Sequence, residues 1–132
     1  MVTDRIGDFI IRLQNAAKVG KQEVAAPYSA HLFAIAKKLK ELGFLASVEV
    51  KGDTAATKEL MVMLACDEKG TPRLRGVKRI SKPGRRLYVP SAGAHQVKGG
   101  TGSRIISSPA GIVSDAEARK AHVGGENLFE IW

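Results

Sequence analysis

Two short polar segments in the C-terminal half carry groups suited to molecular recognition. In the first, Ser107 and Ser108 follow two isoleucines and precede Pro109. A short hydroxyl donates and accepts hydrogen bonds close to its backbone, so it fits the shallow minor groove of an RNA helix or reaches an extruded base. The second, Gly124-Gly125-Glu126, offers backbone for close approach and a carboxylate that accepts from base amino groups or a ribose hydroxyl. For the serines, plain turn residues are the alternative interpretation.

A third segment, Ser81-Lys82-Pro83-Gly84-Arg85-Arg86, concentrates positive charge at a turn. Proline followed by glycine favours a type II turn, so a plain hairpin is the structural interpretation. The tip also carries Lys82, Arg85 and Arg86, with Arg79 just before it, and several cations in one place suit contact with backbone phosphates. The two interpretations are compatible, and the sequence predicts both.

Charge is distributed unevenly along the 132 residues. The chain has 21 Lys and Arg against 13 Asp and Glu, which gives a net charge of +8 and a pI near 9.9. Residues 1–66 hold nine basic and seven acidic residues, residues 67–132 hold twelve and six, and no acidic residue occurs between Lys69 and Ser114. Because a solvated surface normally mixes both signs, this stretch indicates a polyanionic partner, nucleic acid or an anionic membrane surface. Basic residues that only keep the chain soluble are the alternative.

The residue types that support catalysis are scattered. His31, His95 and His122 lack the i, i+4 spacing of a helical metal pair, and Cys66 ends an apolar run in which a buried, inert thiol is expected. The segment Gly99-Gly100-Thr101-Gly102-Ser103 lacks the Gly-Lys-Ser/Thr ending of a nucleotide-binding loop. We therefore expect no enzyme activity, cofactor, metal or small-molecule substrate. A small enzyme that binds a phosphate ligand at residues 99–103 is the alternative.

Cysteine use and hydropathy bear on the compartment. A single cysteine cannot form an internal disulfide, which indicates a reducing compartment. The longest apolar run, Leu60–Cys66, is far shorter than the roughly 20 residues that a membrane-spanning helix needs. Asp4 and Asp8 stand where a secretory signal has basic residues. The sequence therefore predicts a cytoplasmic protein with no membrane partner.

The N-terminal half shows two helical patterns and two strand patterns. One helix is predicted from a cap at Thr3, because apolar residues then recur at i, i+3, i+4 and i+7. A second is predicted between Ser29, its N-cap, and Gly43, a left-handed stop. Strands are predicted at residues 48–50 and 60–65, and the continuous apolar run of the second predicts cover on both faces.

The C-terminal half favours short strands. Residues 67–73 are polar, include glycine and proline and coincide with the charge shift, so they are the predicted linker. Strands are then predicted at 77–80, 86–89 and 104–107, a helix after the capping box Ser114–Glu117, and a final strand at 127–132. The predicted fold class is α+β with two small domains. Residues 1–66 would pack two helices on a short sheet, and residues 74–132 would be mainly β with one short helix.

The aromatic content narrows the kind of nucleic acid. Aromatic residues make up 5% of the chain, and none lies between Phe44 and Tyr88. Serial base stacking, as on single strands, is therefore disfavoured. No predicted helix in the basic half is long and basic enough to read a DNA major groove. The sequence thus favours folded RNA, with a regulator that binds other RNA or DNA as the alternative.

Several motifs, in their order and spacing, resemble the bacterial form of the S-eight family of small-subunit ribosomal proteins nearly from end to end. They are Thr3-Asp4-Arg5-Ile6-Gly7-Asp8, Arg12-Leu13-Gln14-Asn15-Ala16, Val77-Lys78-Arg79-Ile80-Ser81-Lys82-Pro83-Gly84, Gly102 with Ile105-Ile106-Ser107-Ser108, Ser114-Asp115 with Glu117-Ala118-Arg119, Gly124-Gly125-Glu126 and Trp132. The resemblance implies a two-domain α+β structural protein of the small ribosomal subunit. Such a protein binds the central domain of 16S ribosomal RNA directly and supports early assembly.

The resemblance also implies particular residues and partners. The family's serine-rich and Gly-Gly-Glu segments grip an irregular RNA helix, and its N-terminal domain touches further RNA. The residues that the resemblance predicts to bind ribosomal RNA are therefore Ser107, Ser108, Gly124, Gly125, Glu126, Thr3, Asp4 and Asn15. The charge of the turn adds Lys82, Arg85 and Arg86 to the predicted RNA-binding residues. Neighbouring small-subunit proteins are implied partners, and many bacterial members repress translation by binding their own operon messenger. Pro109 departs from the family's third serine, which removes one hydroxyl and one backbone donor.

Overall fold

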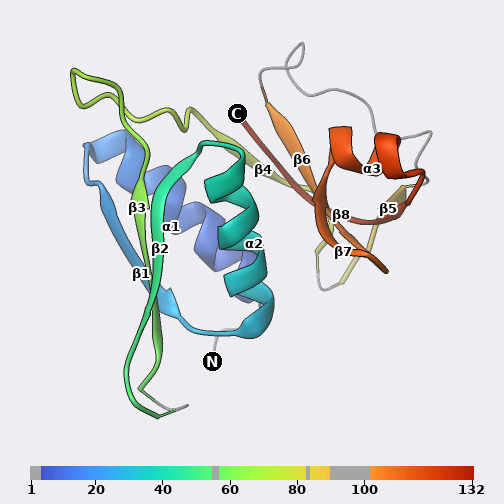
Figure 1. Ribbon diagram of the computed structural model, residues 1–132, viewed down its shortest axis with the longest axis horizontal. Helices are drawn as coiled ribbons and strands as arrows, with labels where there is room; N and C mark the ends of the chain where they lie inside the picture. The colour runs from blue at the N-terminus through green and yellow to red at the C-terminus, as the bar shows by residue number, and fades with distance from the viewer. Residues whose placement is uncertain (1–3, 55–56, 83, 90–101) are drawn as a thin grey trace. The chain divides into compact units, whose positions relative to one another are not determined.

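The chain forms two compact units that each contain an antiparallel sheet. A computed structural model describes residues 4–54, 57–82, 84–89 and 102–132 (Figure 1). One unit comprises residues 8–75, and the other comprises residues 76–132 with the start of the chain up to Gly7. Helices and antiparallel sheets occur together, so the predicted α+β class is confirmed.

The unit of residues 8–75 packs two helices on a three-stranded sheet. Its elements are α1 (Arg5–Val19), β1 (Glu23–Pro27), α2 (Ala30–Glu41), β2 (Leu45–Lys51) and β3 (Glu59–Leu64). The strands pair antiparallel in the order β1-β3-β2 (Figure 1). Ser29 caps α2 by accepting a hydrogen bond from the Leu32 backbone at 3.1 Å, and Gly43, with φ of 90°, follows its end. Both ends of this helix match the sequence prediction.

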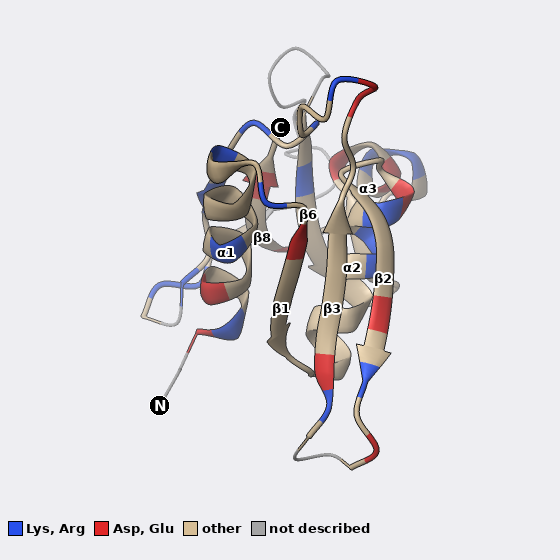
Figure 2. Ribbon diagram, turned by 90° about the vertical axis from the view of Figure 1, so that its left-hand side faces the viewer, with Lys and Arg blue, Asp and Glu red and all other residues tan. Residues whose placement is uncertain are grey.

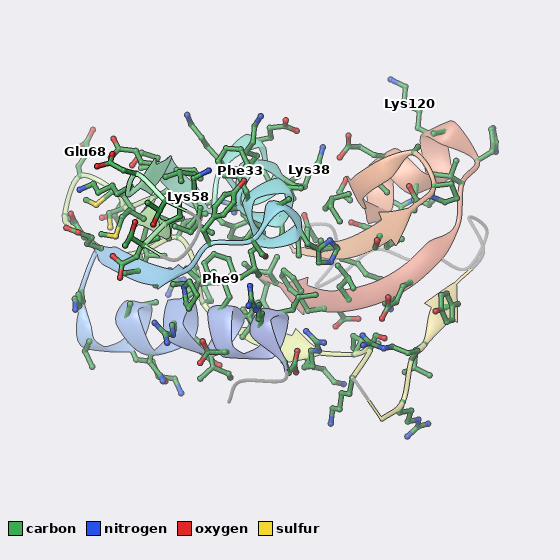
Figure 3. All side chains as sticks on the ribbon, turned by 90° about the horizontal axis from the view of Figure 1, so that it is seen from below. Phe9, Phe33, Lys38, Lys58, Glu68 and Lys120 are labelled. Carbon is green, nitrogen blue, oxygen red and sulfur yellow. The ribbon has the colours of Figure 1, made fainter. Side chains whose placement is uncertain are left out.

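The core of this unit lies between the helices and the sheet. Phe9 points inward from α1 and is fully buried (Figure 3). The other side chains with less than 2% exposure here are Ile10, Leu13, Leu32, Ile35, Ala36, Leu39, Phe44, Leu60 and Val62. Burying each large apolar side chain contributes roughly 1.5–3 kcal/mol, so this cluster is the main source of stability in the unit.

The sheet of this unit differs from the prediction in two respects. Strand β1 is not predicted by the sequence because its centre is two alanines followed by Pro27, which are weak strand formers. Side chains of β3 alternate between buried and half-buried positions, with Met61 and Met63 half-buried. The expectation that β3 is covered on both faces is therefore wrong, because only its Leu60, Val62 and Leu64 face the core.

The other unit is organised around one long strand, β8 (Gly125–Ile131). Its partners are β4 (Val77–Arg79), β5 (Tyr88–Val89) and β6 (Ser103–Ser108), and β7 (Gly111–Ser114) extends the sheet beyond β6. The predicted turn between β4 and β5 is present, because the backbones of Lys82 and Arg85 exchange two hydrogen bonds of 2.9 Å. Beyond this turn, β4 and β5 both pair with β8. Trp132 is held by two 3.0 Å backbone bonds with Gly76, as an ordered final strand predicts.

Helix α3 (Asp115–Ala121) begins with the predicted capping box. The Ser114 hydroxyl accepts a hydrogen bond from the Glu117 backbone at 3.3 Å, and the Glu117 carboxylate accepts one from the Ser114 backbone at 3.2 Å. Ala118 packs the helix onto Ile106 of β6, so the helix covers one face of this sheet. The cap matters because a seven-residue helix has few internal bonds to stabilise it.

The segment predicted as a linker, residues 67–73, lies within the unit of residues 8–75. The Asp67 backbone donates to the Thr71 carbonyl and the Arg73 backbone to the Ala65 carbonyl, both at 2.9 Å. Compact grouping alone does not show which part of a chain folds independently. The domain limits of 1–66 and 74–132 therefore stay a prediction.

We predict that Ser114→Ala lowers the free energy of unfolding by about 1 kcal/mol, the usual cost of a lost N-cap. Urea unfolding followed by circular dichroism measures the change. Ser47→Ala, which removes a hydroxyl from β2 that caps no helix, is the control and should retain most of the stability. Equal losses in both variants would show that the hydroxyl does not stabilise the helix.

Candidate nucleic-acid interface

A row of side chains crosses the sheet of the C-terminal unit at Ser107. On one side Ser107 pairs with Glu126 of β8, and on the other with Ile112 of β7. Glu126 in turn pairs with Tyr88 of β5. Residues directly opposite on antiparallel strands point to the same face, with Cβ atoms about 5 Å apart. Ile112, Ser107, Glu126 and Tyr88 therefore form one line across four strands.

The Glu126 carboxylate in this row is held in place by two donors. Its Oε2 accepts a hydrogen bond from the Ser81 hydroxyl and another from Arg86 Nη1 at 3.1 Å. Ser81 is fully buried, and its hydroxyl also accepts from the Leu87 backbone at 3.2 Å. The Glu126 side chain is 19% exposed. The site therefore presents a carboxylate of fixed orientation at the sheet surface.

The two serines differ in what their hydroxyls already bind. The Ser108 hydroxyl donates to the Gly111 carbonyl at 2.8 Å and accepts from the Ala110 backbone at 3.1 Å, which closes the turn between β6 and β7. Within the described residues, the Ser107 hydroxyl has no hydrogen-bond partner, and its side chain is half-buried. Ser107 is therefore the serine with its hydrogen-bonding capacity available to a ligand.

Gly125 has a structural reason to lack a side chain. A Cβ atom built there would lie 2.2 Å from the carbonyl oxygen of Ser107 and 3.0 Å from the Cα of Ser108. No real Cβ approaches a backbone so closely, so β6 and β8 meet here only because residue 125 is glycine. The neighbouring Gly124 is half-buried.

The predicted cationic loop lies beside β5 in the same unit. Lys82 and Arg85 are exposed, and the Arg86 side chain is 47% exposed while it pairs with Glu126. Pro83, between them, falls outside the described residues. The loop therefore presents two cations to solvent and directs a third toward the Glu126 carboxylate.

The N-terminal candidates separate into different places. Asp4 caps α1, since its Oδ1 accepts from the Gly7 backbone at 3.1 Å, and the same oxygen lies 3.0 Å from Nη2 of Arg79. Thr3, expected to be the cap, falls outside the described residues. Asn15 is exposed on α1 in the other unit and lines an open groove of about 470 Å³ with residues of β1.

Arg79 is the most buried cation near the row. Its side chain is 12% exposed, and burial lowers the pKa of its guanidinium from the usual value. Asp4 opposes that shift, Arg86 adds to it, and Glu126 opposes it. Arginine remains charged at neutral pH in any of these surroundings, so the Glu126 carboxylate interacts with a buried positive charge.

The structure thus groups most of the predicted site. Ser107, Ser108, Glu126 and the cationic loop share one unit with Gly124, Gly125 and Asp4, whereas Asn15 lies in the other. Sequence reasoning missed Tyr88, which is 70% exposed beside Glu126, and the supporting role of Ser81. It grouped Arg79 with the cations of the turn, whereas the structure buries this side chain to 12% exposure. The signal that could have found Tyr88 is strand register, which the sequence does not reveal.

Other surfaces of the described chain have a different character. Each strand of the N-terminal sheet carries a glutamate, and Figure 2 shows acidic residues on all three.

No three His, Cys, Asp or Glu side chains gather as a metal site within the described residues. Cys66 lies beyond the end of β3 and is half-buried, so the expectation of a buried thiol inside that strand is wrong. Across the described ranges, no helix has the length and apolar character to span a membrane.

Comparison with known proteins gives one consistent result. The sequence model of the family described as "Ribosomal protein S8" matches residues 4–132. The chain is 41% identical to the small ribosomal subunit protein uS8 of Mycoplasmopsis synoviae, over 99% of this chain and 98% of that protein. It is 40% identical to uS8 of Cereibacter sphaeroides and 38% identical to uS8 of Chloroflexus aggregans, with the same coverage.

We predict that Gly125→Ala lowers the free energy of unfolding by about 1–3 kcal/mol, since the added methyl overlaps the β6 backbone. Gly84→Ala is the matched control, because a Cβ at Gly84 meets nothing within 4 Å. Urea unfolding of both variants measures the difference. Equal stability of the two variants would contradict the close approach of β6 and β8.

Proposed function

The chain belongs to the ribosomal protein S8 family, and from this membership we propose that its C-terminal unit binds small-subunit ribosomal RNA directly. As a family member it is a structural constituent of the small ribosomal subunit and not an enzyme, and it works within the ribosome in the cytoplasm. Its partners are ribosomal RNA and ribosomal proteins. More specifically, we propose that the C-terminal unit binds an irregular helix in the central domain of 16S ribosomal RNA, and that it does so early in the assembly of the small subunit.

The observation that carries this proposal is the row of Ser107, Glu126 and Tyr88 beside a cationic loop. The Ser107 hydroxyl can donate and accept in an RNA minor groove. The Glu126 carboxylate, acceptor only, suits a base amino group or a ribose 2′-hydroxyl. The exposed Tyr88 ring can stack on one unpaired base, which a regular duplex lacks but an irregular helix provides. Together these groups favour folded, irregular RNA.

The cationic loop supplies a different contribution to binding. Lys82 and Arg85 have no ion-pair partner among the described residues and are exposed, so they can neutralise phosphates. Such contacts attract any RNA, whereas the row discriminates among RNAs by local fit. Arg86, fixed against Glu126, links the two sets of contacts.

The remaining predicted residues have secondary roles in this proposal. Ser108 and Gly125 shape the backbone that presents Ser107, and Gly124 lets RNA approach the end of β8. We propose that Asn15, which is exposed on α1, touches further RNA, and we propose the same for Thr3 from the family motif. Asp4 uses its carboxylate on Gly7 and Arg79, so we propose that it acts through Arg79.

Translational autoregulation would use the same surface. If the operon messenger contains an irregular helix like the ribosomal one, then Ser107, Glu126 and Tyr88 meet the same groups in both. We therefore extend the proposal to that messenger, where binding would compete with ribosomal RNA for one site.

We predict that Ser107→Ala and Glu126→Gln each weaken binding to the central-domain helix by about 1–3 kcal/mol. Ser107→Ala removes a hydroxyl, and Glu126→Gln removes the negative charge and replaces one acceptor oxygen with an amide donor. Binding to an unrelated duplex RNA should change little. Filter binding at fixed salt measures both affinities.

Matched controls lie in the N-terminal sheet. Ser47→Ala removes a hydroxyl from β2, and Glu49→Gln makes the same charge change as Glu126→Gln on an exposed residue of that strand. Neither control should alter specific binding. The proposed row is wrong if the four variants bind the two RNAs alike.

We predict that Arg85→Ala weakens binding to all RNAs and reduces the slope of log affinity against log salt by about 0.7–0.9, the value of one phosphate contact. Titrations between low and moderate salt measure the slope. Lys40→Ala, an exposed cation on α2, is the charge-matched control and should leave it unchanged. An unaltered slope for Arg85→Ala would argue against phosphate contact by the loop.

A further inference from the structure

Glu126 of the row belongs to a set of four charged side chains that form two ion pairs. Asp4 pairs with Arg79 at 3.0 Å, and Glu126 pairs with Arg86 at 3.1 Å. The two pairs interact, because the charges of Asp4, Arg86 and Glu126 all act on Arg79, which lies at the end of β4 two residues before Ser81. Ser81 is the residue whose hydroxyl binds the Glu126 carboxylate. The carboxylate at the surface is thus supported by the segment that also holds the buried cation.

Arg79 itself is poorly placed to touch RNA. Its side chain is 12% exposed, against 47% for Arg86. Its Nε and Nη1 are buried and have no hydrogen-bond partner within the described residues, so one ion pair and nearby carboxylates are its main compensation. A buried, incompletely satisfied charge costs stability, so its presence calls for an explanation.

We propose that Arg79, together with Asp4, is a positioning residue that sets RNA specificity by holding Glu126 and Arg86 in their presented geometry. The inference rests on the proposed function, since it assigns Arg79 an effect on the same RNA site. Without the guanidinium, Asp4 and Glu126 become two carboxylates with one compensating cation, Arg86. Arg86 is then no longer repelled by Arg79, so the ion pair between Arg86 and Glu126 is free to change its geometry.

The pKa of Arg79 agrees with this arrangement. Burial is the largest influence and lowers it, while Asp4, Arg86 and Glu126 are the charges that act on it. The Arg79 guanidinium therefore interacts electrostatically with the carboxylates of Asp4 and Glu126 and with the guanidinium of Arg86. Asp4 therefore has two roles in the unit that contains the row, since it caps α1 and pairs with Arg79.

The test is a double-mutant cycle between Arg79→Gln and Glu126→Gln, with affinities for the central-domain helix and for an unrelated duplex. If Arg79 acts through Glu126, Arg79→Gln alone weakens specific binding by about tenfold, and adding it to Glu126→Gln costs less than about twofold more. The salt slope of Arg79→Gln stays at the wild-type value, because a buried cation releases no counterions from RNA.

Arg104→Gln is the matched control. Arg104 is similarly buried, at 15% exposure of its side chain, and it pairs with Glu130 at 2.8 Å on the opposite face of the same sheet. Its loss should reduce thermal stability without changing the preference for specific RNA. If Arg104→Gln impairs that preference as much as Arg79→Gln does, general destabilisation explains both and the inference is wrong.

Asp4→Asn is the second variant, useful because Asp4 is one-third exposed and its loss is less disruptive to folding. It should show a smaller loss of specific binding and the same lack of additivity with Glu126→Gln. Additive losses, or a reduced salt slope for Arg79→Gln, would overturn the positioning role alone. If Glu126→Gln by itself leaves specific binding intact, the proposed RNA site fails, and the inference fails with it.

Discussion

Antiparallel pairing along β8 is the constraint on which the candidate interface depends. Glu126 near one end of this strand is opposite Tyr88 on one edge and Ser107 on the other, so three residues far apart in sequence become neighbours. The pairing is possible because Gly125 admits the β6 backbone at a distance that no side chain tolerates. Farther along, β4 pairs with the same strand and brings in Arg79. Recognition groups and their supports thus share one backbone framework.

A carboxylate within a basic surface would repel RNA unless its charge were compensated. Here Glu126 accepts from Ser81 and Arg86, and a buried arginine lies nearby, so the group retains its acceptor oxygens without presenting a bare negative charge. In this account the exposed cations of the neighbouring loop supply attraction to any phosphate backbone. The rigid row then selects the RNA whose irregular groove matches its donors and acceptors.

Local sequence signals predicted much of the fold. Both ends of α2, the capping box of α3 and the strands β3, β4, β6 and β8 follow from caps, apolar spacing and glycine positions. Strand β1 escaped prediction because alanine and proline carry little strand preference. The sequence also could not give pairing partners, since register depends on contacts between distant segments. For that reason Ser107 and Glu126 were predicted separately, and the roles of Tyr88 and Ser81 emerged only from the sheet. Arg79 was predicted among the cations of the turn, but only the structure shows that it is buried.

The most direct test of the central claim is an NMR titration of the isotopically labelled full chain with the central-domain RNA helix. The account predicts that backbone amides of Ser107, Glu126 and Tyr88 shift first and saturate together, while amides of the acidic N-terminal sheet stay unchanged. Shifts confined to residues 8–75, or spread evenly over every exposed lysine and arginine, would contradict a prefolded recognition row on β5, β6 and β8.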